Sequence, residues 1–389
     1  MPPRPNLKRV AEAAKVSVAT ASLALRNSPR CAAKTRRLVA RIAERLGYTP
    51  DPHVARLMSY LHRSGQGRDG ATLAYITAFA ERDGWRGLHT WEKYFAGAKS
   101  RALALGYRLE EFSLREPGMS EQRLSTILCT RGIAGLILAP LPDGMSRLNL
   151  DWSKFACVAI GFSLQEPQVH RVAHNHLRSM RVALDHVHGC GYRRVGLVMS
   201  RLHDARVDWQ WSSAFLGYQQ GSGRTPASIF DAPAETEFLL AWFRREKPDV
   251  IISDVLTVPW QLERAGFRVP RDFAFVHLNR PTENKELAGI DQHSERVGEA
   301  AVKQLVAALH GNESGLPRLP DTTLVCGEWV EGLSLPPAGA AESPPVAIAP
   351  LWEAARGRVV PRSGIDDPEE IESPRTARTK RARRVGVRR

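Results

Sequence analysis

The first pattern with recognisable chemistry lies between residues 7 and 22, where small apolar residues alternate with basic and hydroxyl-bearing ones. Val10, Ala11 and Ala14 would give one helix a face of small side chains that a second helix can cross closely. Ser17 stands where its hydroxyl can cap that second helix. Short side chains on the first turns of such a helix suit contacts to base edges in a major groove. The pattern predicts a helix-turn-helix that binds DNA.

The residues expected at DNA form two groups in this segment. Six lie in the cap and the second helix: Ser17, Val18, Ala19, Thr20, Ser22 and Leu23. Of these, Val18, Ala19, Ser22 and Leu23 would face base edges. Three arginines lie around the helices and would hold phosphates: Arg26, Arg30 and Arg36. The alternative for the basic residues is an ordinary solvated surface.

Patterns for catalysis or metal binding are incomplete. Gly189 and Gly191 begin a nucleotide-binding glycine motif, but Arg194 stands at its third glycine. His170, His174 and His176 lie close together without a cysteine or carboxylate at ligand spacing, which predicts surface histidines and no metal site. The phosphate-loop, zinc-protease and nucleophile-elbow motifs are missing as well. The sequence therefore predicts neither an enzyme nor a bound cofactor.

The positive charge is concentrated at the two ends of the chain. The 389 residues carry a net charge of +14. Residues 1–63 hold thirteen Lys and Arg against three acidic residues, and residues 374–389 hold eight basic residues and no acidic one. Because Lys and Arg that neutralise phosphates release condensed counterions, basic ends on a slightly acidic body predict binding to a polyanion.

The hydrophobic pattern divides the chain into four parts. Residues 1–50 are predicted to be an all-α helix-turn-helix domain, with helices over 7–14, 18–26 and 33–46, and residues 51–70 a short amphipathic stretch and glycine-rich linker. In residues 71–335, strand candidates alternate with amphipathic helices, which predicts an α/β core of parallel sheets in two lobes. Residues 336–389, rich in Pro, Ala and Arg, are predicted to be a disordered basic tail.

The predicted core elements share this alternation. They cover residues 72–79, 94–105, 108–113, 120–130, 135–139, 156–160, 177–188, 194–199, 209–220, 237–245, 250–253, 273–278 and 296–310. The five cysteines are odd in number and form no CxxC pair, which predicts buried thiols in a reducing compartment. No run of eighteen apolar residues and no charged-then-apolar leader is found, so we expect a soluble, cytoplasmic protein.

The N-terminal segment resembles the LacI/GalR family of bacterial regulators. The resemblance rests on Val10-Ala11, Val16-Ser17, Thr20-x-Ser22, Asn27-Ser28-Pro29-Arg30, Thr35-Arg36 and Leu46-Gly47-Tyr48-x-Pro50, in the family's order and spacing. It implies a hinge helix after Tyr48 whose leucine wedges into the minor groove, which places that leucine at Leu57 beside Arg56. The alternative is that Leu57 packs only against its dimer mate. Leu23, Arg26-Asn27 and Ala32 depart from the usual residues, so no operator sequence is transferred from relatives.

Residues 71–335 resemble the periplasmic-binding-protein-like core of the same family. Two stretches carry this resemblance, Gly191-Tyr192-Arg193-Arg194-Val195 and Gly266-Phe267-Arg268-Val269-Pro270-Arg271-Asp272. The resemblance implies five effector-binding residues: Tyr94, Phe95, Arg206, Asp254 and Asn279. Each has a structural alternative, with Arg206 in a surface ion pair, Asp254 as a helix cap and the two aromatic residues in the core. Gly161, Asn175 and Asn279 replace frequent aspartates of relatives, which argues against a simple sugar as effector.

Taken together, the resemblance implies a homodimeric regulator that places two recognition helices on a palindromic operator. A small-molecule effector of unknown identity would change how the hinges are held, and repression is expected rather than activation. The alternative is an effector-independent or weakly specific DNA-binding protein with a degenerate core. A solute-binding protein for transport is disfavoured by the basic helix-turn-helix.

Overall fold

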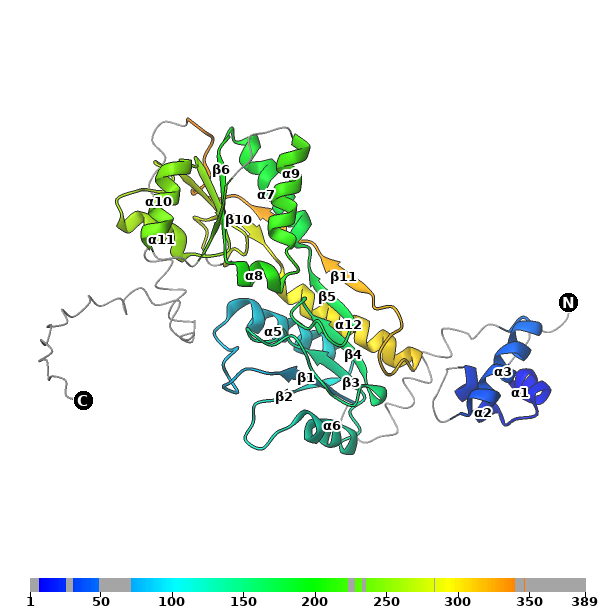
Figure 1. The fold of residues 1–389 in the computed structure, drawn as a ribbon. Coiled ribbons are helices and arrows are strands. Elements are labelled where there is room, and N and C mark those ends of the chain that lie inside the picture. Colours follow the sequence, from blue (N-terminus) through cyan, green and yellow to red (C-terminus); the bar gives the residue numbers. More distant parts are fainter. Residues whose placement is uncertain are drawn as a thin grey trace, which may run out of the picture.

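Figure 1 shows the fold of the computed structural model, which describes residues 7–25, 31–48, 71–222, 228–232, 236–282, 284–339 and 346. Residues 7–48, as far as they are described, contain the helices α1 (Leu7–Ala14), α2 (Val18–Leu25) and α3 (Ala33–Arg45). Small and β-branched residues form the shared core of these helices: Val10, Ala11, Ala14, Ala21, Ala24, Val39 and Ile42. The predicted all-α N-terminal domain is confirmed.

The rest of the described chain forms two α/β lobes, each built on a six-stranded sheet. The N-lobe sheet has the order β11-β5-β4-β3-β1-β2, and all its pairs are parallel. The C-lobe sheet has the order β12-β10-β9-β8-β6-β7, in which only β12 is antiparallel. Central strands such as β3 and β8 are buried along their whole length, as expected for parallel sheets covered on both faces. The predicted fold class is confirmed.

The N-lobe takes its elements from two parts of the chain, residues 72–174 and 294–325. They are β1 (Thr72–Thr77), α5 (His89–Ala104), β2 (Arg108–Ser113), α6 (Glu121–Thr130), β3 (Gly135–Leu138), η1 (Trp152–Lys154), β4 (Ala156–Ile160), β5 (His170–His174), α12 (Ser294–Gly311) and β11 (Thr322–Val325). In Figure 1 this lobe lies nearer the N-terminal helices, with α5 and α12 side by side.

The C-lobe takes the elements between β5 and α12, together with β12, which follows β11. They are α7 (His176–Gly189), β6 (Val195–Met199), α8 (Arg201–Arg206), α9 (Gln210–Ser222), β7 (Ile229–Asp231), α10 (Thr236–Glu246), β8 (Val250–Ser253), α11 (Thr257–Arg264), β9 (Ala274–His277), β10 (Ala288–Asp291) and β12 (Glu328–Val330). The chain therefore crosses between the lobes from β5 to α7, from β10 to α12 and from β11 to β12.

Most of the predicted core elements agree with the structure to within two residues at each end. α5 begins five residues earlier than predicted, at His89. The pattern missed α8 because this helix is short and polar, and α11 because Pro259 lies in its first turn, where a proline is tolerated. It missed β5 because only Val172 and Ala173 of this strand are apolar, and charged or polar residues flank them.

Two expectations about polar and sulfur-containing residues are corrected. His174 and His176 are buried rather than on the surface, because they lie at the crossover from β5 to α7, where both lobes cover them. Among the free cysteines, Cys31 and Cys157 are buried as predicted, whereas Cys326 is exposed on the third crossover.

The beginning of the predicted tail is attached to the C-lobe. The backbone N–H of Ala338 donates to Cys190 O at 2.7 Å, and that of Val346 donates to Val269 O at 2.9 Å. Val346 is buried in the C-lobe core. Residues 340–345 and 347–389 lie outside the described residues, and so do the predicted linker and hinge at 51–70.

Helix α3 lacks a side-chain cap, as the sequence suggested. Ala32 has the extended backbone of an N-cap residue, with φ −55° and ψ 141°, and its side chain makes no capping hydrogen bond. We expect Ala32→Ser to raise the free energy of unfolding of the N-terminal domain by about 1 kcal/mol, because a serine hydroxyl can accept one of these N–H groups. Urea unfolding followed by circular dichroism measures this, with Ala40→Ser, exposed on the same helix, as the control that should give no gain.

Candidate DNA-binding and effector-binding sites

Helix α2 is fixed at its start by Ser17. The Ser17 hydroxyl accepts the backbone N–H of Thr20 at 3.0 Å and lies 2.8 Å from the Thr20 hydroxyl. Lys15 adopts a left-handed backbone conformation, with φ 53°, which turns the chain between α1 and α2. Ala21 and Ala24 are buried against the neighbouring helices, whereas Val18 is 47% exposed. The first turn of α2 is therefore held rigidly, with an apolar side chain on its outer face.

The predicted DNA-contacting residues lie in several environments. Ser17 and Val18 are exposed, while Thr20, Ser22, Leu23 and Arg36 are half-buried. Ala19 lies within α2. Four predicted contacts fall outside the described residues: Arg26, Arg30, Arg56 and Leu57. The assignment of these residues to DNA stays a prediction.

Arg206 links the two lobes. It is the last residue of α8 in the C-lobe, and its guanidinium pairs with the Asp143 carboxylate and donates to Leu141 O at 2.6 Å, both in the N-lobe loop after β3. The guanidinium also lies 5.4 Å from the ring centre of Trp91. Its side chain is only 19% exposed. The sequence singled out Arg206 but missed Asp143, although this residue follows the carboxyl end of a parallel strand, where ligands of such folds bind.

Asp254 lies in a cluster with two histidines at the carboxyl end of the C-lobe sheet. His203 Nδ1 is 3.0 Å from Asp254 Oδ2. His277, the last residue of β9, accepts the backbone N–H of Asn279 at Nδ1, 3.1 Å away, so the proton of the neutral ring is on Nε2. Asp254 Oδ1 and His277 Nε2 are buried without a hydrogen-bond partner among the described residues. A ligand hydroxyl or a water could satisfy an acceptor and a donor placed in this way.

Burial dominates the ionisation of His277. It lowers the pKa of His277 to about 4, against the opposing effect of the nearby Asp254 carboxylate. His277 is therefore neutral near pH 7 and presents an N–H donor rather than a cation.

Tyr94 and Phe95 belong to the N-lobe, whereas Asn279 belongs to the C-lobe. Tyr94 and Phe95 pack in the N-lobe core, where the Phe95 ring meets Tyr75 edge to face at 5.0 Å. Burial raises the pKa of Tyr94 to about 12, and the positive charge of Arg206 partly offsets this. Asn279 Nδ2 donates to Thr90 Oγ1 across the lobes, at 2.8 Å. Stacking of the aromatic pair on a ligand stays a prediction, because both rings serve the core.

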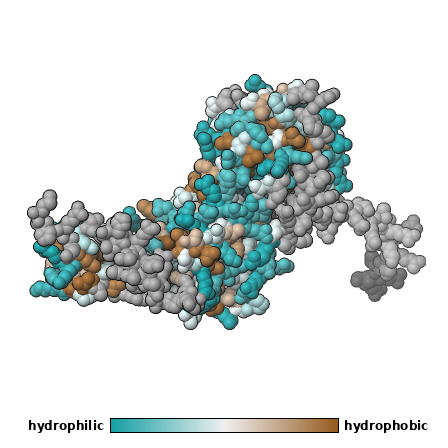
Figure 2. Space-filling view, turned by 180° about the vertical axis from the view of Figure 1, so that it is seen from behind, coloured by the Kyte–Doolittle hydropathy of each residue, from teal (hydrophilic) through white to brown (hydrophobic). Residues whose placement is uncertain are grey.

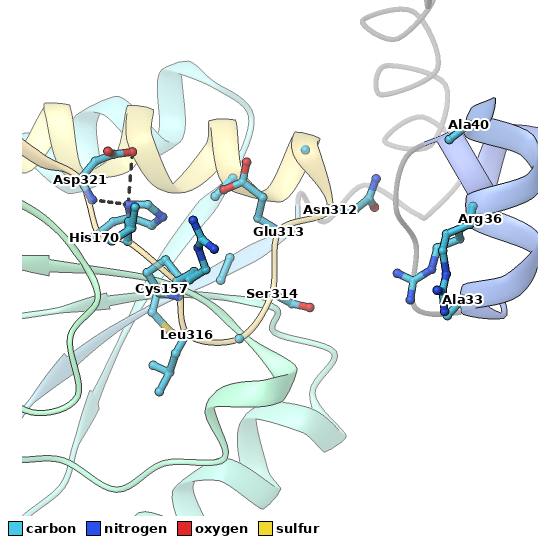
Figure 3. A pocket seen from close by; sticks show the side chains of 18 residues that line it. Ala33, Arg36, Ala40, Cys157, His170, Asn312, Glu313, Ser314, Leu316 and Asp321 are labelled. Atoms are coloured by element: carbon cyan, nitrogen blue, oxygen red, sulfur yellow. Dashed lines mark hydrogen bonds and ion pairs between the residues drawn. The ribbon is translucent and has the colours of Figure 1, made fainter. Parts of the chain in front are cut away.

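A separate cavity of about 860 Å³ lies between the N-terminal helices and the base of the N-lobe. Figure 3 shows Ala33, Arg36 and Ala40 of α3 on one side and residues such as Glu313 on the other. His170 and Asp321 lie farther from α3, and the backbone N–H of Asp321 donates to His170 Nδ1 at 3.0 Å. None of the predicted effector-binding residues lines this cavity. It is a space between domains rather than the predicted effector site.

On the face seen in Figure 2, the described residues of both lobes are largely hydrophilic, and the hydrophobic ones among them form separate patches. Among the described residues, no helix is both long and apolar enough to cross a membrane.

The comparisons with known proteins point to one group. Residues 6–51 match the family model described as bacterial regulatory proteins, lacI family. The HTH-type transcriptional regulator PtxS of Pseudomonas plecoglossicida is 24% identical over 328 residues, which cover 81% of this chain and 92% of that protein.

Solved structures share the fold. A complex of the transcriptional regulator CelR with cellobiose superposes with a TM-score of 0.50 at 19% identity, over 84% of this chain and 99% of that one. A lac repressor dimer bound to operator and an anti-inducer gives a TM-score of 0.50 at 18% identity, over 85% of this chain and 98% of that one. A LacI transcriptional regulator from a Rhodococcus species gives 0.52 at 15% identity, over 68% and 98%.

Proposed function

The chain carries the DNA-binding domain of the lacI family of bacterial regulatory proteins, and from this we propose that it is a sequence-specific transcriptional repressor. It binds a palindromic operator as a homodimer, and a small molecule held between the lobes changes its affinity for DNA. The observation that carries this proposal is the capped, rigid start of α2, in the segment that matches the family model. We assign the protein to the cytoplasm and give it no catalytic role.

The DNA-binding side of the proposal rests on α1 and α2. The buried small residues of α1 and α2 let the two helices pack closely, as a helix-turn-helix requires. The exposed Val18 at the start of α2 suits contact with a thymine methyl group. Two such domains, related by the twofold axis of a dimer, would read two half-sites.

The effector side rests on residues that meet where the lobes face each other. In the C-lobe, Asp254 and Asn279 lie just beyond the carboxyl ends of β8 and β9, and Arg206 ends helix α8. Tyr94 comes from the first turns of α5 in the N-lobe. Asp254 Oδ1 and His277 Nε2, which are buried without a hydrogen-bond partner among the described residues, supply polar groups with which a pocket orients a ligand. Because the linkage is reciprocal, an effector that changes operator affinity must bind more or less tightly when DNA is present.

Selection of bound sequences from random DNA, with the full chain at a stated salt concentration, tests the proposal. Recovery of a palindrome is expected. Binding without a recovered motif would reject sequence-specific regulation and favour the second candidate, a weakly specific DNA-binding protein. That second candidate is favoured by the loss of three frequent aspartates at Gly161, Asn175 and Asn279, since Asn175 instead caps α7 by accepting the N–H of Arg178.

Leu57→Ala is expected to weaken binding to the selected operator by roughly tenfold or more, while binding to random DNA changes little. The reason is that an apolar wedge helps to stabilise the bent duplex of the specific complex, whereas non-specific binding depends on phosphate contacts. Fluorescence anisotropy with both DNAs at the same salt concentration measures the two affinities. Leu61→Ala, at a nearby apolar position, serves as the matched control; equal losses on both DNAs for Leu57→Ala would mean that this residue is no wedge.

A further inference from the structure

Away from the three crossovers, the hydrogen bonds between the two lobes cluster at one place among the described residues. Besides the contacts of Arg206 with Asp143 and Leu141, Asn279 donates to Thr90, and Lys93 Nζ donates to Thr282 Oγ1 at 2.6 Å. In every pair one partner is in α5 or the loop after β3, and the other is in α8 or the loop after β9. These bonds join the facing sides of the two lobes and do not involve the three crossovers that connect the lobes.

The end of α8 is anchored so that the Arg206 side chain reaches the N-lobe. Asp204, two residues earlier on α8, is buried, and its carboxylate accepts the N–H of Trp211 at 3.2 Å. The N–H of Trp209 donates to Asp204 O at 2.8 Å, and Asp208 and Trp209 both adopt left-handed backbone conformations. This tight turn anchors the end of α8 on α9, so that little freedom is lost when Arg206 binds its partner.

Asp143 is more exposed than Arg206. It lies in the loop after β3, and its side chain is 43% exposed against 19% for Arg206. An ion pair between a largely buried guanidinium and a more exposed carboxylate is strong enough to bias a two-state equilibrium, and an acceptor of a ligand can replace the carboxylate.

We propose that Arg206 and Asp143 form a latch that holds the two lobes closed when no ligand is bound. The inference builds on the proposed function, since it makes closure the resting state of the effector cleft. A molecule that enters the cleft must then provide Arg206 with acceptors in place of Asp143 and Leu141. Its effect on DNA binding follows from whether the lobes close again around it.

Hydrogen exchange followed by mass spectrometry, on the full chain without DNA, tests the latch. In Arg206→Ala and in Asp143→Asn, peptides covering 88–94, 139–145 and 278–282 are expected to exchange roughly tenfold faster than in the wild type, since a charge-assisted bond closes the cleft. Peptides from β3 and β8, buried inside each lobe, should be unchanged. The double variant with Asp143→Arg and Arg206→Asp restores the opposite charges and is expected to slow the exchange again.

Arg201→Ala is the matched control, because Arg201 is exposed at the start of the same helix. Unchanged exchange in both single variants would overturn the latch. It would also be overturned by faster exchange throughout β3 and β8, or by a charge-swapped variant that behaves like the single variants. The measurement is independent of DNA, so a failure to recover an operator would reject the proposed function without affecting this result.

Discussion

Gly298→Ala is expected to lower the free energy of unfolding of the N-lobe by about 3 kcal/mol or more. A Cβ atom at Gly298 of α12 would lie 2.0 Å from the carbonyl oxygen of Tyr94 on α5. The same contact is tight from the other side, since a Cβ at Gly97 would lie 1.9 Å from the carbonyl oxygen of Glu295. Because the obstacles are backbone atoms in two helices, no side-chain rotation relieves the clash and the helices must separate.

Urea unfolding monitored by circular dichroism gives the difference from the wild type. Gly217→Ala is the matched control: Gly217 also lies in a helix, α9, but no atom is within 4 Å of the added Cβ. This control is expected to raise stability by up to about 1 kcal/mol, because alanine favours a helix more than glycine does. If Gly298→Ala and Gly217→Ala gave similar stabilities, the close approach of α5 and α12 would be contradicted.

Lowering the pH from 6.5 to 5 is expected to destabilise the protein through three buried histidines. Burial lowers the pKa of His174 to about 3, that of His277 to about 4, and that of His176 well below its ordinary value of 6.5. Between these values and 6.5 the unfolded chain binds protons that the folded chain does not. Stability is therefore complete above pH 6.5 and decreases as the pH falls, by about 1.4 kcal/mol per pH unit for each histidine.

Equilibrium unfolding at several pH values between 5 and 7.5 measures this slope, in a range where unperturbed carboxylates stay ionised. His176→Phe should reduce the slope by about one third while keeping the ring contacts with His174 and Trp211. A slope that is the same in His176→Phe and in the wild type would show that these histidines are not the cause.

The sequence predicted the N-terminal domain well because its signals are local. Helix α1 and the start of α2 follow from small-residue spacing and the Ser17 cap, and both occur as expected. The buried strands β3, β4 and β8 were also predicted, because strands covered on both faces are continuous apolar runs. Short polar elements such as α8 carry no periodic signal and were missed.

The candidate effector site was predicted only in part. Arg206, Asp254 and Asn279 lie where the lobes face each other, but the sequence did not indicate Asp143, Thr90 or His277 as their neighbours. Arg206 and Asp143 are 63 positions apart in the sequence, and Asn279 and Thr90 are 189 positions apart. No local pattern encodes such a contact.

By itself, the sequence determined the class of the protein, because the helix-turn-helix motif, the alternation of strands and helices and the placement of basic residues are properties of neighbouring positions. Only the tertiary structure decided which polar residues meet. The crossovers from β10 to α12 and from β11 to β12 place α12 and β11 in the N-lobe, apart from the C-lobe elements that precede and follow them in sequence. His174 and His176 are buried at the crossover from β5 to α7. The same arrangement brings Arg206 to Asp143, because the free energy of burial and pairing depends on proximity in space and not along the chain.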